Sequence, residues 1–116
     1  MTGKPKYQLC DGELSIEERV VHFPYPVAQV IIVDSRVIVR LAVPSKERFD
    51  RNVYALSLDG KGVWQIQEAP HGGNVAKPFM NLRLSDEGRL IAGNWIGVDY
   101  EVDLTSGQVS AVKFAK

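Results

Sequence analysis

The sequence contains a single cysteine, no excess of charge of either sign and no long uninterrupted apolar run. One cysteine cannot form an internal disulfide, so the fold does not depend on an oxidising compartment. Basic and acidic residues are equal in number and no two basic residues are adjacent, which argues against a nucleic-acid surface. The longest apolar stretch, Val27 to Val43, is interrupted by polar residues and cannot span a bilayer. We expect a soluble cytoplasmic protein with no nucleic-acid or membrane partner.

The 116 residues fit one domain, 1–116, made almost entirely of β-strands. Short runs rich in Val, Ile, Leu, Tyr and Trp alternate with turn sequences, and no long segment repeats at helical spacing. Ser15–Glu18 has the S-x-x-E form of a helix capping box, but the adjacent apolar residues fit a strand equally well. The pattern predicts an all-β fold: two four-stranded antiparallel meanders, propeller-blade-like repeats, preceded by an N-terminal edge segment, 1–26.

The first repeat, 27–68, and the second, 79–114, each contain four predicted strands joined by hairpin-like turns. Val27–Val33 is apolar on both faces, which favours a position inside a sheet. In the following strand, alternate residues form a buried face. These residues are Val37, Val39, Leu41 and Val43.

The two repeats can be aligned with each other. Val53–Gln67 aligns without gaps with Asp99–Lys113, which places Tyr54 opposite Tyr100. The preceding hairpins also align, and the first repeat is longer only in the charged loop before Val53. Matching turns and strand phase indicate an internal repeat.

The repeated segments resemble β-propeller blades. VYALSLDGKGVWQ (53–65) is similar to the strand–turn–strand of quinoprotein-type propellers, and LRLSDEGRLIAG (82–93) and VDLTSGQV (102–109) resemble hairpins of WD-repeat and related blades. The Gly-His and Trp-Asp dipeptides of WD repeats are absent, and Ser110 replaces the tryptophan found at Trp64. The resemblance implies the blade as a unit, with Trp64 buried, but no quinone or other cofactor. Two blades are fewer than a closed ring needs.

No arrangement of residues predicts catalysis or metal binding. Cys10 could act as a nucleophile with His22 or His71, but their spacing does not require contact. His71-Gly72-Gly73 resembles an esterase oxyanion loop, yet no G-x-S-x-G elbow accompanies it.

An acidic stripe lies on one predicted strand of the second repeat. Asp99, Glu101 and Asp103 share one face of that strand, where three carboxylates could attract calcium. No encircling loop supplies further oxygen ligands, so we expect a solvated face paired across strands with Arg36, Arg40 or Arg89 and no functional metal ion.

Two polar loops carry the best candidates for binding. The loop Ser45–Arg51 places Phe49 between Arg48 and Arg51, a mixture typical of protein interfaces, although Phe49 could instead fold back onto the domain. In the second repeat, Asn94 and Trp95 lie between glycines at a strand end.

The sequence therefore predicts a small non-enzymatic protein-interaction module. Three alternatives stay open: a carbohydrate or small-ligand binder with Trp64 or Trp95 as a stacking surface between blades, a bacterial immunity-type inhibitor, and an enzyme centred on Cys10. Strand edges at Val63–Gln67 and Val109–Phe114 carry little charge, so we expect a homo-oligomer to which residues 1–26 contribute.

Overall fold

The chain folds into three antiparallel sheets, each a meander of strands that follow one another in sequence. The computed structural model describes residues 7–10, 12–44, 46–47, 49–68, 78–94 and 97–112, and no helix occurs among them. The all-β class and both four-stranded meanders are confirmed. The strands are β1 (Tyr7–Cys10), β2 (Glu13–Ile16), β3 (Arg19–His22), β4 (Val27–Val33), β5 (Arg36–Leu41), β6 (Val53–Ser57), β7 (Gly62–Gln65), β8 (Phe79–Leu84), β9 (Leu90–Asn94), β10 (Asp99–Val102) and β11 (Val109–Ala111).

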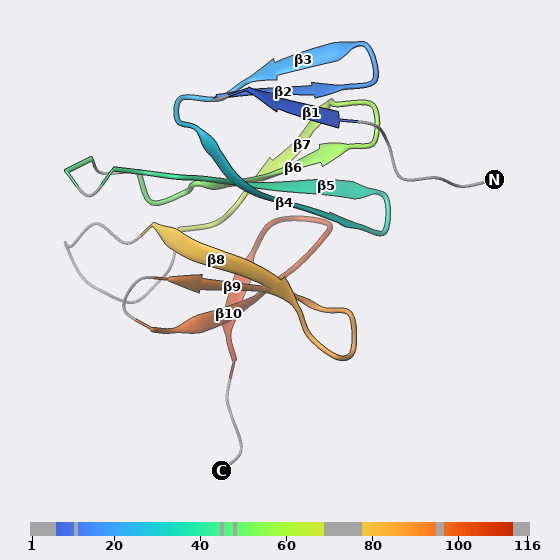
Figure 1. Cartoon of the computed structure of the whole chain (residues 1–116). Helices are drawn as coiled ribbons and strands as arrows, with labels where there is room; N and C mark the ends of the chain where they lie inside the picture. Colours follow the sequence, from blue (N-terminus) through green and yellow to red (C-terminus); the bar gives the residue numbers. More distant parts are fainter. Residues whose placement is uncertain are drawn as a thin grey trace.

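We refer to β1–β3 as the N-terminal sheet, β4–β7 as the central sheet and β8–β11 as the C-terminal sheet. Figure 1 shows them stacked as three layers with the central sheet in the middle. The central sheet is therefore covered on both faces. Its face toward the N-terminal sheet packs in one apolar cluster, whose buried members are Leu14, Ile16, Val37, Val39, Leu41 and Leu56.

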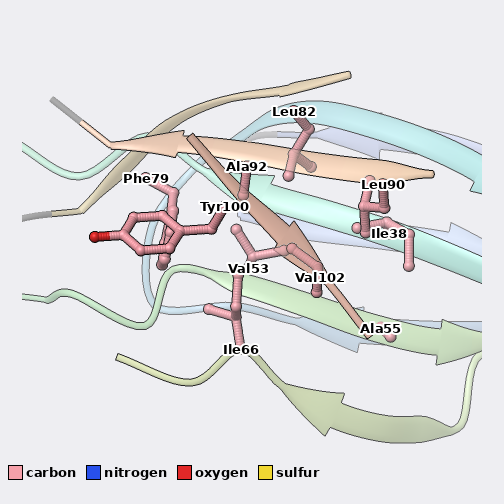
Figure 2. Close-up of a cluster of buried hydrophobic side chains, with 10 residues drawn as sticks. All are labelled: Ile38, Val53, Ala55, Ile66, Phe79, Leu82, Leu90, Ala92, Tyr100 and Val102. Atoms are coloured by element: carbon pink, nitrogen blue, oxygen red, sulfur yellow. The ribbon is translucent and has the colours of Figure 1, made fainter. Parts of the chain in front are cut away.

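The second apolar cluster joins the opposite face of the central sheet to the C-terminal sheet. Figure 2 shows its side chains converging from both sheets. The cluster consists of Ile38, Val53, Ala55, Ile66, Phe79, Leu82, Leu90, Ala92, Tyr100 and Val102. Alternation along β5 and β6 divides neighbouring residues between the two clusters, as a pleated strand requires.

The N-terminal segment forms a sheet of its own rather than a single edge strand. Leu14 and Ile16 in β2 are fully buried on either side of the half-buried Ser15, a period of two that suits a strand lying on the central sheet. The capping-box pattern does not start a helix, because Glu17 adopts a φ of 54° in the tight turn between β2 and β3.

The expectation that Val27–Val33 lies inside a sheet is wrong. β4 is an edge strand of the central sheet, paired only with β5 among the described strands. It is apolar on both faces because the whole sheet lies between two others. Apolarity on both faces therefore reflects stacking of sheets here, and not a central place within one sheet.

Side-chain amides join the central and C-terminal sheets. The amide of Gln29 in β4 donates to Leu82 O (2.7 Å) and accepts from Leu82 N (2.9 Å) in β8. Gln67 accepts from Val109 N (2.8 Å) in β11. Each of these side chains forms hydrogen bonds with backbone groups that would be unpaired at the edge of an isolated sheet.

Trp64 in β7 adds a further connection between these two sheets. Its indole Nε1 donates to Leu104 O (2.8 Å), and its ring lies against Gly107, where a Cβ atom would come within 2.7 Å of the ring. Gly107 also has a φ of +80°, which favours glycine. The predicted structural position of Trp64 agrees with these contacts, although the side chain is partly rather than fully buried.

The aligned repeats occupy equivalent places in their sheets. Tyr54 lies in β6 and its ring contacts Phe23, on the side of the N-terminal sheet, with ring centroids 5.2 Å apart. Tyr100, its counterpart in β10, is fully buried on the side of the central sheet. Each tyrosine thus faces the preceding sheet, which supports an internal repeat. The sheets are open, and the likeness to propeller blades stays a prediction.

Candidate functional site

Loops from all three sheets meet at one end of the stack, which we call the loop end. It lies on the left in Figure 1 and contains the β3–β4, β5–β6 and β9–β10 connections, whereas the β2–β3, β4–β5, β6–β7 and β8–β9 turns lie at the opposite end. Backbone hydrogen bonds connect neighbouring loops: Phe23 N donates to Gly12 O (2.7 Å) and Ala42 N donates to Pro26 O (2.8 Å). Loops held on a rigid scaffold are common places for binding residues. The described parts of the loop end are Gly12 and the segments 23–26, 42–44, 46–47, 49–52, 66–68 and 97–98.

An aromatic pair lies on this end. The rings of Tyr25 and Phe49 are 5.3 Å apart and tilted, and both side chains are half-buried. Phe49 packs beside the cluster between the N-terminal and central sheets, so part of its ring faces inward. The Tyr25 hydroxyl donates to Glu47 Oε1 (2.9 Å), and this hydrogen bond is the main reason that the pKa of Tyr25 is raised.

Arg51 is held in place beside the aromatic pair. Its Nε donates to Ile66 O (2.7 Å) and its Nη2 to Gln65 O (3.2 Å), while Gln65 Nε2 donates to Arg51 O (2.7 Å). An open groove of about 390 Å³ lies over these groups. Its lining is formed by Phe49, Asp50, Arg51, Gln65 and Glu68. The groove therefore offers an aromatic edge beside charged groups of both signs, of which Arg51 is held in place.

Asn94 closes the turn between β9 and β10 at the same end. Its Oδ1 accepts from Val98 N (3.0 Å), its backbone N donates to Val98 O (3.0 Å), and Gly97 has a φ of +91°. Asn94 is 4% exposed, and its Nδ2 has no hydrogen-bond partner among the described residues. Because Asn94 is buried, its side chain stabilises this turn from inside the fold. Arg48 and Trp95 lie outside the described residues.

Asn52 joins the two candidate loops, a role that no pattern in the sequence predicts. The buried Asn52 amide donates to Leu41 O (2.9 Å) and to Phe79 O (2.9 Å), and its Oδ1 accepts from Phe79 N (2.8 Å). Phe79 in turn pairs with Asn94 across β8 and β9. Arg51 and Asn94, which are far apart in sequence, are therefore connected through one asparagine. An asparagine after a charged loop looks like an ordinary turn residue, which is why it was missed.

Cys10 does not meet a histidine within the described chain. Cross-strand pairing places Cys10, Glu13 and His22 in one row across the N-terminal sheet, with Glu13 in the middle. His22 Nδ1 lies 3.2 Å from Glu13 Oε2. Thiol and imidazole are two strands apart, about 10 Å, which is too far for a nucleophile–base hydrogen bond. His71 lies outside the described residues.

The acidic stripe of β10 is paired with arginines. Asp99 contacts Arg83 (3.0 Å) and Glu101 contacts the predicted partner Arg89 (3.2 Å). Asp103 accepts hydrogen bonds from the backbone N–H groups of the β10–β11 turn. The other two predicted partners bind elsewhere, since Arg40 Nε donates to Gln29 Oε1 and Arg36 donates to Ser35 O. No cluster of metal-ligating side chains occurs in the described segments.

Calcium is expected to leave the melting temperature of the protein unchanged. Asp99 and Glu101 already face arginines, and the stripe lacks the encircling oxygen ligands that calcium prefers. Thermal unfolding with millimolar calcium or with a chelator tests this expectation. A calcium-dependent rise in melting temperature that is lost in Glu101→Gln would contradict it.

The three stacked antiparallel meanders place the chain among all-β proteins with open sheets. The chain belongs to the family described as Domain of unknown function (DUF7957), whose model matches residues 5–114. Comparison with curated proteins and with solved structures gave no match. Over the described segments, the structure contains no helix long and apolar enough to cross a membrane.

Proposed function

We propose that the chain is a non-enzymatic, cytoplasmic protein-binding module whose loop end contacts the partner. The observation that carries the proposal is the groove beside the aromatic pair, where Phe49 and Arg51 lie together over the central sheet. Arginine and aromatic side chains are enriched among residues that dominate protein interfaces. Arg51 is already fixed by two backbone carbonyls, so little side-chain entropy is lost when a partner binds.

The distribution of polar groups supports a protein partner over a sugar. The indole N–H of Trp64 is already bound to Leu104 O and its ring is covered by Gly107, so it does not offer a free stacking face there. The groove is shallow and carries both charges, which suits a protein surface with complementary charges.

Site-specific photo-crosslinking tests the proposal. A photoreactive amino acid at the exposed Glu47 on the loop end is expected to give one discrete adduct in the cells that naturally produce the protein. The matched control places the same group at Glu87, which is exposed in the β8–β9 turn at the opposite end. A purified partner identified from the adduct should bind the Arg51→Glu variant about tenfold more weakly or worse.

The same adducts from both positions, or none from the loop end, would contradict a loop-end interface. Unchanged affinity of the Arg51→Glu variant for the identified partner would show that the groove is not the contact.

A further inference from the structure

The edges of the three sheets are not equally protected. β3 carries Arg19 and His22, and β11 is only three residues long. β4 and β8 lie together through the amide of Gln29 and each has an irregular register, as does the pairing of β7. Charge, short length, irregularity and cover are the usual devices that stop an edge strand from pairing with another chain.

β1 lacks charge and irregular pairing, and no described strand covers its outer edge. Its sequence, Tyr-Gln-Leu-Cys, contains no charge and no proline, its pairing with β2 is regular, and all four residues are exposed. It pairs with β2 alone among the described strands. In an antiparallel pair, alternate residues direct their N–H and C=O groups away from the partner strand. β1 therefore presents backbone donors and acceptors along its outer edge.

The apolar face of the N-terminal sheet continues out to this edge. Tyr7 and Leu9 lie opposite Ile16 and Leu14, whose side chains are fully buried against the central sheet. Tyr7 and Leu9 themselves are 40% and 45% exposed. A strand added beside β1 would cover both side chains as well as the backbone edge.

We propose that a second copy of the chain pairs with β1 through its own β1, antiparallel, so that the two N-terminal sheets form one continuous sheet. A two-fold axis perpendicular to the sheet passes through Gln8, and Tyr7 lies opposite Leu9 of the second copy. This register keeps the apolar side chains of both copies on the same face, as the alternation of a strand requires.

The two apolar side chains of β1 favour a second copy as the occupant. Tyr7 and Leu9 lie on either side of Gln8 and are both exposed. Antiparallel pairing about Gln8 places Tyr7 of each copy beside Leu9 of the other, so each copy covers the exposed apolar side chains of its partner. The same surface is then used twice, as in an isologous dimer.

Analytical ultracentrifugation of the full chain over a range of concentrations tests the proposal. We expect a monomer–dimer equilibrium, with the dissociation constant raised about tenfold or more in Leu9→Lys, because each lysine then replaces the apolar side chain that lies opposite Tyr7 of the other copy. The matched control, Val20→Lys, changes the most exposed apolar residue of the opposite edge strand and should leave the dimer intact. A monomeric wild type, an unaffected Leu9→Lys dimer, or loss of the dimer in Val20→Lys would each overturn the proposal.

Disulfide trapping gives a second measurement that does not depend on the lysine variants. Gln8→Cys in a Cys10→Ser background should form a covalent dimer on mild oxidation, since residues opposite each other across strands lie within reach of a disulfide. Val20→Cys in the same background should form no covalent dimer. Equal trapping in both variants, or none at Gln8→Cys, would exclude this register.

Discussion

Replacing Asn52 with alanine is expected to lower the free energy of unfolding by about 3–5 kcal/mol. Asn52 is 1% exposed and its amide makes three hydrogen bonds to the backbone of Leu41 and Phe79. The alanine variant would leave two carbonyls and one N–H of the backbone buried without their partner, and each such group costs about 1–3 kcal/mol. Chemical denaturation followed by tryptophan fluorescence measures this loss.

Two further variants separate hydrogen bonding from side-chain size. Asn81→Ala removes an exposed asparagine of β8 and should change stability by less than about 0.5 kcal/mol. Asn52→Asp keeps the shape but replaces the two amide donations with a carboxylate facing two carbonyl oxygens, and it should also destabilise the fold strongly. If Asn52→Asp were as stable as the wild type at neutral pH, the assigned bonds would be wrong.

Trp64→Ala is expected to cost about 3 kcal/mol, near the lower end for removal of a large aromatic side chain because the ring is only partly buried. The variant loses the hydrogen bond to Leu104 O and the contact with Gly107. Trp64→Phe keeps an aromatic ring but loses the indole N–H. We expect it to lower the free energy of unfolding by about 1 kcal/mol more than Val63→Ala, a control that changes the exposed neighbouring residue. Thermal and chemical unfolding provide both values.

An unchanged melting temperature in Trp64→Ala would show that the side chain does not hold the two sheets together. Weakened partner binding with unchanged stability would instead place Trp64 in the interface.

The fold class could be predicted because strand signals are local. Alternation and turn residues between Val27 and Ala111 identify both meanders, and the alignment of Tyr54 with Tyr100 identifies equivalent strands. The N-terminal sheet was harder to predict. A short segment such as Glu13–Ile16 fits a helix start or a strand, and only burial of Leu14 and Ile16 on the central sheet decides between them.

The candidate site was predictable only in part. The charged loop around Phe49 was visible in composition, but its ring contact with Tyr25 depends on how two distant loops meet. The role of Asn52 depends on the stacking of β8 beside β5, which no local pattern records. The position of β4 within its sheet was predicted wrongly for the same reason. A strand at the centre of a sheet and a strand at the edge of a sheet covered on both faces have the same apolar pattern.

Every sheet of this molecule is a meander, and this has a consequence for the order of folding. Each strand pairs with its neighbour along the chain, so the sheets can form from contacts close in sequence, which is kinetically favourable. The amide of Gln29 reaches the backbone of Leu82, and that of Asn52 the backbone of Phe79, only when the central and C-terminal sheets dock. If the two sheets docked one residue out of register, these polar groups would be buried without hydrogen-bond partners. The same side chains that stabilise the native stack therefore also select the native register late in folding.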